Sequence, residues 1–336
     1  MILITGGSGL VGSHLVTELL AQGFQVRVLV RSGESKNWIR KVMGYYMPDP
    51  DNALKKVEWA NGDILDKVSL AEALQGVDYV FHCAAVVSFS RSDRKYMLDV
   101  NIRGTANLVD ACLAAGIKKL VHLSSIAAIK AGLPGTFAIE SNGWPEGHKL
   151  NYAYSKTQGE FEVWRGITEG LNAVILNPSV ILGPGNWKSG SPKFFSTVYK
   201  RLKFYTRGVT GFVDVCDVVK VMVMFMQNNI HSQRYIVSAE NLSYQQLFTA
   251  IALSLGVKPP SVYAAPALTR LAVYAGMVKS ALFFSPPLIT AETERSAHKV
   301  NHYSSDKLIG DTGFTFLPVE SSIERIAKLF ISDKKL

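Results

Sequence analysis

The sequence contains a tyrosine and a lysine at a spacing that favours proton transfer. Tyr152 and Lys156 stand four residues apart in the run Tyr-Ala-Tyr-Ser-Lys, and a helix that begins there would place both side chains on one face. A phenol with an ordinary pKa of about 10 is a weak base at neutral pH, but a neighbouring ammonium favours the phenolate and lowers that pKa. The pair could therefore exchange a proton with a carbonyl or alcohol oxygen. Tyr154 is the alternative tyrosine, but it is only two residues from Lys156 and would face elsewhere.

Two serines offer a hydroxyl for the same reaction. Ser124 and Ser125 end a short apolar run that begins at Lys119 and is typical of a buried parallel strand. Ligand sites of α/β proteins lie at the carboxyl ends of such strands. We expect Ser125 to hydrogen-bond the substrate oxygen, with Ser124 as the alternative. The expected catalytic residues are Ser125, Tyr152 and Lys156.

A glycine-rich loop predicts a dinucleotide site near the N-terminus. The run Thr-Gly-Gly-Ser-Gly-Leu-Val-Gly over residues 5–12 stands between an expected strand and an expected helix. The first glycine of its Gly-x-x-Gly-x-x-Gly pattern permits a tight turn, the second lets the backbone approach a pyrophosphate, and the third lets the helix pack closely. The unpaired amides of the first helical turn favour the anion. The expected contacts are Gly6, Gly9, Leu10, Val11 and Gly12.

The end of the second expected strand favours NADP(H) over NAD(H). An acidic residue there would bind the adenosine ribose hydroxyls of NAD, but the sequence reads Val-Leu-Val-Arg-Ser over 28–32 with no carboxylate before Glu34. Arg31 offers a planar donor fork to a 2′-phosphate, and Ser32 adds a hydroxyl. The alternative is that Arg31 is only a solvated strand end.

Further cofactor contacts are expected after the third and fourth strands. Asp63 is placed to accept a hydrogen bond from the adenine amino group, with Ile64 beside it. Ala84 and Ala85 are small enough to let the cofactor lie across the sheet edge. Lys156 would in addition hold the nicotinamide ribose, and the positive ring would favour the phenolate further.

The elements that must position these residues predict an α/β fold. In the first half, short β-branched runs alternate with helical patterns, which indicates a Rossmann-type doubly wound parallel sheet. The expected strands are 2–5, 25–31, 57–62, 79–84, 119–124 and 173–182, and the expected helices are 10–22, 101–115 and 154–169.

After Pro184 the alternation is lost, which predicts a smaller, mostly helical substrate lobe. Its expected helices are 243–255, 268–283 and about 321–329. Strand-like runs at 211–215 and 234–237 are expected to return to the sheet. We therefore assign 1–178 to a dinucleotide-binding domain, to which about 209–240 returns, and 179–336 to an interleaved lobe.

Taken together, these residues resemble the extended short-chain dehydrogenase/reductases, also called the NAD-dependent epimerase/dehydratase family. The resemblance runs over most of the chain and includes the glycine loop, His-Cys-Ala-Ala at 82–85, Asn-Ile-Arg-Gly-Thr at 101–105 and the stretch 177–184. It implies that Pro178 packs near the nicotinamide and that Asn101 is a helix residue with a structural role.

Three details favour a reductase within that family. The sugar-nucleotide dehydratases of the family that this sequence resembles have a Thr-Asp-Glu run. This sequence has Ser124-Ser125-Ile126 at that place, so the acid/base pair for water loss is missing. The stretch 180–184 is apolar where sugar-nucleotide enzymes carry an asparagine. Asn177-Pro178 and Arg31 look like the dihydroflavonol reductase, cinnamoyl-CoA reductase and 3-beta-hydroxysteroid dehydrogenase branch. The expected reaction interconverts a ketone or aldehyde and its alcohol on a mostly apolar small molecule.

Two other functions stay open as alternatives. One is a sugar-nucleotide epimerase that recycles a tightly held NAD, and the other is a sensor that binds NADP(H) without chemistry. The apolar residues that could line the substrate site are equally explained by core packing. They are Val86, Val87, Phe89, Phe194, Phe195, Phe283 and Phe284.

Composition excludes several other classes of protein. With 48% hydrophobic and 19% charged residues, the 336-residue chain is expected to be a folded cytoplasmic enzyme without a signal peptide or membrane span. Three dispersed cysteines and seven histidines predict neither disulfides nor a metal site.

The net charge of +9 is explained only in part by a phosphorylated cofactor, and no nucleic acid partner is expected because no base-reading motif is present. Peripheral membrane association through 268–284 and the basic stretch 193–207 is an alternative to a lobe helix. A homodimer is one expected assembly, because helix pairs often dimerise in this family.

Overall fold

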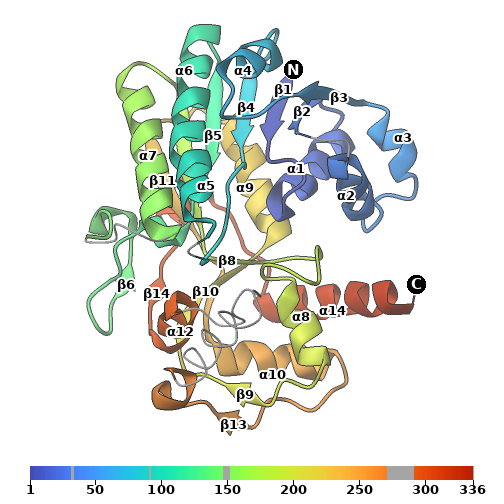
Figure 1. Cartoon of the computed structure of the whole chain (residues 1–336), viewed down its shortest axis with the longest axis vertical. Coiled ribbons are helices and arrows are strands. Elements are labelled where there is room, and N and C mark those ends of the chain that lie inside the picture. Colours follow the sequence, from blue (N-terminus) through green and yellow to red (C-terminus); the bar gives the residue numbers. More distant parts are fainter. Residues whose placement is uncertain (32–33, 91, 147–151, 271–290, 336) are drawn as a thin grey trace.

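A seven-stranded parallel sheet forms the centre of the computed structural model, which describes residues 1–31, 34–90, 92–146, 152–270 and 291–335 (Figure 1). The strand order is β11-β7-β5-β4-β1-β2-β3. Their bounds are β1 (Ile2–Thr5), β2 (Val26–Val30), β3 (Val57–Asn61), β4 (Tyr79–His82), β5 (Lys119–Leu123), β7 (Ala173–Pro178) and β11 (Gln233–Val237). The predicted doubly wound sheet is thus confirmed. The order reverses between β1 and β4, and a ligand crevice is expected at such a switch point.

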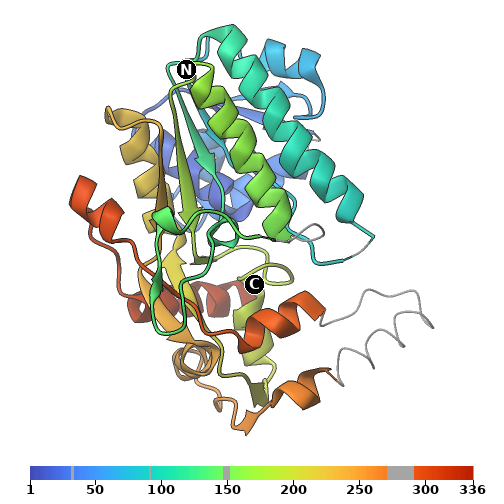
Figure 2. The ribbon, with the colours of Figure 1, turned by 90° about the vertical axis from the view of Figure 1, so that its left-hand side faces the viewer.

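Helices cover both faces of this sheet because its strands are apolar on both sides (Figures 1 and 2). Ile4 belongs to the core on one face, while its neighbour Leu3 belongs to the core on the other. The first face is covered by α1 (Leu10–Ala21), α2 (Glu34–Met43) and α9 (Val215–Gln227). The second is covered by α4 (Lys67–Ala73), α6 (Thr105–Ala115) and α7 (Tyr152–Thr168). Shorter helical segments in this half are α3 (Pro50–Leu54), α5 (Arg94–Leu98), the π-helical turn η1 (Asp99–Gly104), η2 (Ile126–Ala128) and η3 (Glu140–Asn142).

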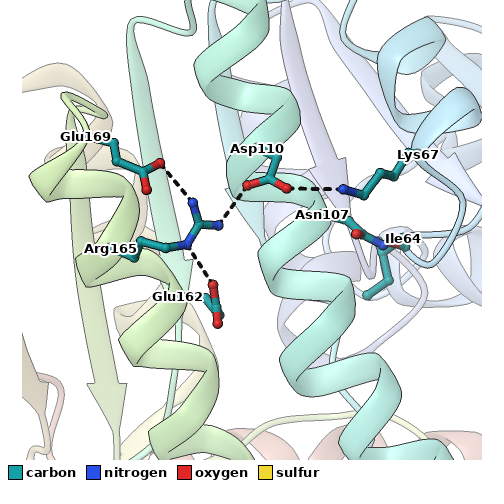
Figure 3. A network of polar contacts seen from close by, with 7 residues as sticks. All are labelled: Ile64, Lys67, Asn107, Asp110, Glu162, Arg165 and Glu169. Atoms are coloured by element: carbon teal, nitrogen blue, oxygen red, sulfur yellow. Dashed lines mark hydrogen bonds and ion pairs between the residues drawn. The ribbon is translucent and has the colours of Figure 1, made fainter.

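An ion-pair network fixes α7 against α6 (Figure 3). Arg165 of α7 lies 2.7 Å from Asp110 of α6, and the same guanidinium pairs with Glu162 and Glu169 one turn to either side. Asp110 also lies 3.2 Å from the ammonium of Lys67. Because these side chains are partly exposed, the network contributes modestly to stability and mainly sets how the two helices align.

One expectation about the sheet is wrong. The run at 211–215 was expected to return to the main sheet, but β10 (Val209–Asp214) instead pairs in parallel with β8 (Val180–Leu182) and antiparallel with β12 (Glu240–Ser243). The chain leaves the main sheet at Ser179, which divides the expected strand 173–182 into β7 and β8. Buried strands of both sheets have the same apolar composition, so the pattern alone does not tell which sheet a strand joins. The run at 234–237 does return, as β11 beside β7.

The second half forms a lobe with its own core. Leu182, Phe195, Phe212, Ile326 and Phe330 belong to this cluster. Its helices are α8 (Lys193–Tyr199), α10 (Tyr244–Ser254), α12 (Ala291–His298), α13 (Asp306–Thr312) and α14 (Val319–Lys335). Short strand pairs join β9 (Phe204–Tyr205) to β13 (Val262–Tyr263) and β6 (Phe137–Ala138) to β14 (His302–Tyr303).

Most of the helix expected over 268–283, together with Phe283 and Phe284, lies outside the described residues. Among the helices that the structure describes, each is too short or too polar to cross a bilayer.

Candidate active site

The glycine loop forms a tight cradle between β1 and α1. Gly6 has a φ of +70°, and a Cβ there would lie 2.5 Å from the main-chain nitrogen of Ala84. A Cβ at Gly12 would lie 2.2 Å from the carbonyl oxygen of Gly6. Both positions therefore require glycine. Gly9 is the residue before α1, and a Cβ there would meet only the Gly6 oxygen, at 3.3 Å. The open space over Gly9 and the amides of Leu10 and its neighbours, which α1 leaves without carbonyl partners, fit a pyrophosphate.

The ends of β1 and β4 are held together by a buried hydrogen-bond chain. The Thr5 hydroxyl lies 2.7 Å from Nδ1 of His82 and accepts from the amide of Ala84 at 3.3 Å. Nε2 of His82 lies 3.0 Å from the hydroxyl of Thr105 in α6. Burial lowers the pKa of His82 to about 3, so the imidazole is neutral. This hydrogen-bond chain fixes the position of the loop that carries Ala84 and Ala85.

Arg31 lies at the exposed end of β2 and contacts a residue that the sequence analysis did not consider. Its guanidinium donates a hydrogen bond to the hydroxyl of Tyr96 in α5. A guanidinium has five N–H donors, so this contact leaves donors for an anion at the same strand end. Ser32 lies outside the described residues.

Asp63 and Ile64 follow β3, beside the same crevice. Oδ1 of Asp63 accepts a hydrogen bond from the amide of Leu65 at 2.9 Å, so one carboxylate oxygen holds the loop and the other is left for a ligand. Ile64 is buried, and a Cβ at Gly104 would lie 2.5 Å from its Cδ1. Its carbonyl accepts from Asn107 at 3.1 Å, and both residues are labelled in Figure 3.

Tyr152, Lys156 and Ser125 come together where the first turn of α7 meets the end of β5. The Lys156 ammonium donates to the carbonyl of Leu123 at 2.8 Å. Ser125 caps η2 by accepting from the amide of Ala127 at 3.1 Å, and its side chain lies near enough to Tyr152 to oppose the rise in the phenol's pKa. The sequence-predicted residues are therefore neighbours in the structure.

The acidity of Tyr152 differs from the expectation. Burial raises the pKa of Tyr152 to about 12, and the nearby Ser125 side chain opposes this only in part. Lys156 does not lower it, because its ammonium is directed at the Leu123 carbonyl and is itself buried, which lowers the pKa of Lys156 to about 8. In the protein alone the phenol is therefore protonated at neutral pH.

Asn101 connects the loop after β4 to the first turn of α7. Its amide accepts from the Val86 amide at 2.7 Å and donates to the Val86 carbonyl at 2.9 Å. The same amide nitrogen donates to the hydroxyl of Ser155 at 2.9 Å, and Ser155 in turn donates to the Tyr152 carbonyl at 2.7 Å. These contacts, made from the π-helical turn η1, agree with the structural role that the family resemblance implies.

A buried ion pair beneath Lys156 was missed by the sequence analysis. Glu160 lies 3.4 Å from the guanidinium of Arg234 in β11, with side chains 0% and 7% exposed. Trp144 donates to Glu160 at 3.0 Å. Asn177 donates both to Glu160 and, at 2.9 Å, to the Ser125 carbonyl. Glu160 stands one helical turn after Lys156, a spacing that could have indicated its position, but no local pattern joins it to Arg234.

The apolar residues proposed for the substrate site divide into two groups. Phe195 is fully buried in the lobe core, and Phe194 packs on Phe248 with ring centroids 5.7 Å apart, so both have packing roles. By contrast, Val87 and Phe89 are 63% and 39% exposed. The Phe89 ring meets the Tyr152 ring edge-on at 6.0 Å. Pro178 is the buried last residue of β7, opposite Val237 of β11.

Comparison with known proteins identifies relatives in sequence and in fold. Residues 2–238 match the model of the NAD dependent epimerase/dehydratase family. The chain is 28% identical over 304 residues to sterol demethylase protein B of Methylococcus capsulatus, covering 90% of this chain and 86% of that protein. It is 32% identical over 266 residues to a putative dihydroflavonol 4-reductase of Synechocystis, covering 76% and 73%. The crystal structure of gox2253 superimposes with a TM-score of 0.80 at 28% identity, covering 100% of this chain and 99% of that one.

Proposed function

We propose that this chain, which belongs to the NAD-dependent epimerase/dehydratase family, is an NADP(H)-dependent oxidoreductase. It would interconvert a ketone or aldehyde and the alcohol of a mostly apolar small molecule. The observation that carries this proposal is the meeting of Ser125, Tyr152 and Lys156 at the end of β5, beside the switch point between β1 and β4. Similarity to a putative dihydroflavonol 4-reductase supports the reductase assignment.

The chain's residues suit the reductive direction. Nicotinamide, when bound, supplies the hydride in reduction and accepts it in oxidation. Tyr152, whose pKa is raised to about 12, is a proton donor at neutral pH and would protonate the carbonyl oxygen. The Ser125 hydroxyl would bind that oxygen and orient it. Lys156 would hold ribose hydroxyls through its ammonium.

Preference for NADP(H) rests on the end of β2. Arg31 is exposed there, and its contact with Tyr96 occupies one of the five donors of the guanidinium. A 2′-phosphate is a dianionic acceptor that a guanidinium can bind through two parallel hydrogen bonds. The first residue with a carboxylate after β2 is Glu34.

We also propose a revised division of the chain. The dinucleotide-binding unit would comprise 1–178 together with α9 and β11, since α9 packs on the sheet face of α1 and β11 extends the sheet. The substrate lobe would comprise 179–214 and 238–336.

Cofactor binding and turnover test the proposal together. Purified protein is titrated with NADPH and with NADH, with nucleotide fluorescence as the readout, and is then assayed with a panel of apolar ketones and aldehydes. We expect NADPH to bind at least tenfold more tightly and at least one carbonyl to oxidise it. NAD that co-purifies and does not exchange would instead favour the epimerase, and tight NADPH binding without turnover on any carbonyl would favour the sensor.

A further inference from the structure

The outer end of the substrate lobe carries basic side chains without carboxylate partners. Six of them are exposed and belong to no ion pair among the described residues: Lys193, Lys200, Arg201, Lys203, Arg207 and Lys258. Basic residues elsewhere are often paired, as Arg27 is with Glu58 and Lys118 is with Asp78. The sequence contains no acidic residue over 170–213 or 241–291. The positive charge at this end is therefore not neutralised locally.

These cations gather on one part of the molecule. β9 pairs with β13, and α8 and β9 both pack on α10. In Figure 1 this group lies at the end of the molecule away from the seven-stranded sheet. Without these six residues the chain would hold 30 basic against 27 acidic side chains, so they account for most of the net charge of +9.

Exposed apolar side chains stand among the same cations. Phe204 of β9 is 48% exposed, Val262 of β13 is 45% exposed, and Leu253 at the end of α10 is 68% exposed. Tyr263 is 36% exposed, and the Arg207 guanidinium lies 4.4 Å from the centre of its ring. We call this surface the basic tip and define it by the six cations above together with Phe204, Leu253, Val262 and Tyr263.

We propose that the basic tip docks the protein on the surface of an anionic phospholipid bilayer. Stable peripheral binding needs two contributions, apolar side chains that enter the headgroup region and cations that attract anionic lipid, and the tip presents both together. A nucleic acid surface fits less well, because two of the four apolar side chains of the tip, Leu253 and Val262, are aliphatic, and a base stacks on aromatic rings and not on aliphatic chains. The proposal goes beyond the proposed reaction and does not depend on it.

Vesicle flotation tests this proposal without any measurement of turnover. The full chain is mixed with vesicles of phosphatidylcholine alone, or of phosphatidylcholine with phosphatidylglycerol, at low and at high salt. The variants are Lys203→Glu/Arg207→Glu, which removes tip charge, and Phe204→Ser/Val262→Ser, which removes tip apolar area. Lys55→Glu/Lys56→Glu is the matched control, since it makes the same charge change at exposed positions beside α3, on the dinucleotide-binding part. Thermal melting confirms that each variant is folded.

We expect flotation only with the anionic vesicles and loss of it at high salt. Each basic residue near an anionic surface strengthens membrane binding roughly fivefold. Lys203→Glu/Arg207→Glu should therefore lower the partition coefficient by about twentyfold or more. Phe204→Ser/Val262→Ser should also lower it, while the control should stay within about twofold of the wild type. The proposal would be overturned if the wild type did not float with anionic vesicles, or if the control variant lost as much vesicle binding as the tip variants. Binding to single-stranded RNA but not to vesicles would also overturn it. None of these outcomes bears on the proposed reductase activity.

Discussion

Glu160 and Arg234 form an ion pair in the interior, 3.4 Å apart, although one lies on α7 and the other on β11. The pair joins the helix that carries Tyr152 and Lys156 to the edge of the sheet. Through Asn177, which donates to both Glu160 and the Ser125 carbonyl, it also fixes the position of Ser125. We therefore infer that this ion pair holds the residues of the candidate active site in position.

Removing the charge of Glu160 should destabilise the protein strongly. Glu160→Gln keeps the size of the side chain but leaves the buried charge of Arg234 without its carboxylate, with only the carbonyls of Glu140 and Gly143 to accept from it, and losing one partner of a buried pair costs about 3–5 kcal/mol. The matched control is Glu162→Gln on the same helix, where the carboxylate pairs with a partly exposed arginine and its loss costs under about 1 kcal/mol. Urea unfolding measures both. Equal unfolding free energies for the two variants would show that the buried pair has no supporting role.

Gly12→Ala should disrupt the close packing of the glycine loop against the start of α1. Its Cβ would lie 2.2 Å from the Gly6 oxygen, so backbone must move, and NADPH affinity should fall at least tenfold. Gly310→Ala in α13 is the control, because a Cβ there meets nothing within 4 Å and alanine favours a helix by up to about 1 kcal/mol. Nucleotide titration and thermal melting check both variants. A Gly12→Ala variant that binds NADPH with unchanged affinity would contradict the assignment of the glycine loop as the pyrophosphate site.

Acid should destabilise the protein through three buried histidines. Burial lowers the pKa of His14 to about 4, that of His82 to about 3 and that of His122 well below its ordinary value. The folded state keeps them neutral while the unfolded chain binds protons below about pH 6.5, so stability is fully present above that pH and is lost as pH falls.

A single substitution isolates one of these histidines. The ring nitrogens of His122 are buried without hydrogen-bond partners among the described residues, so His122→Leu removes one depressed pKa and breaks no hydrogen bond there. The leucine replaces the contact of the His122 ring with the His82 ring, whose centres are 5.0 Å apart. The free energy of unfolding, measured with urea between pH 6 and pH 4.5, should fall less steeply in the variant by up to about 1.4 kcal/mol per pH unit. Identical slopes for the variant and the wild type would be inconsistent with a neutral buried His122.

Arg31 should decide between the two dinucleotides. Arg31→Ala removes a charged hydrogen-bond donor worth about 1.5–3 kcal/mol, so NADPH affinity should fall tenfold or more while NADH affinity changes little. Tyr96→Phe is the control, because it removes only the hydroxyl to which Arg31 donates and leaves the guanidinium available. Titration of each variant with both nucleotides gives the comparison. Equal losses for NADPH and NADH in Arg31→Ala would remove the case for a 2′-phosphate contact.

The sequence predicted the parts of the site that depend on local patterns. The glycine loop, the strand ends at Ser125 and Ala84, and the Tyr152–Lys156 spacing each follow from a few consecutive residues, and the parallel sheet brings their ends to one edge. Contacts between distant segments could not be predicted in the same way. Glu160 and Arg234 stand 74 residues apart, and each alone resembles an ordinary surface charge.

Two expectations failed for the same physical reason. The partner strand of 211–215 and the acidity of Tyr152 both depend on what surrounds a segment in three dimensions. Spacing placed Lys156 near Tyr152, but it did not show that the ammonium donates to the Leu123 carbonyl or that burial would raise the phenol's pKa. Periodicity showed that 211–215 is a strand, but not which sheet it extends.

Single-turnover oxidation of NADPH in two tyrosine variants tests the central claim most directly. Tyr152→Phe removes the proposed proton donor, and Tyr154→Phe makes the same chemical change two residues away in the same turn of α7. With a carbonyl substrate identified from the panel, the Tyr152→Phe rate should fall by about 10²–10⁴-fold, the usual contribution of a general acid, with NADPH affinity changed little. The Tyr154→Phe rate should stay within a few-fold of the wild type. A Tyr152→Phe enzyme that oxidises NADPH at the wild-type rate would contradict the account.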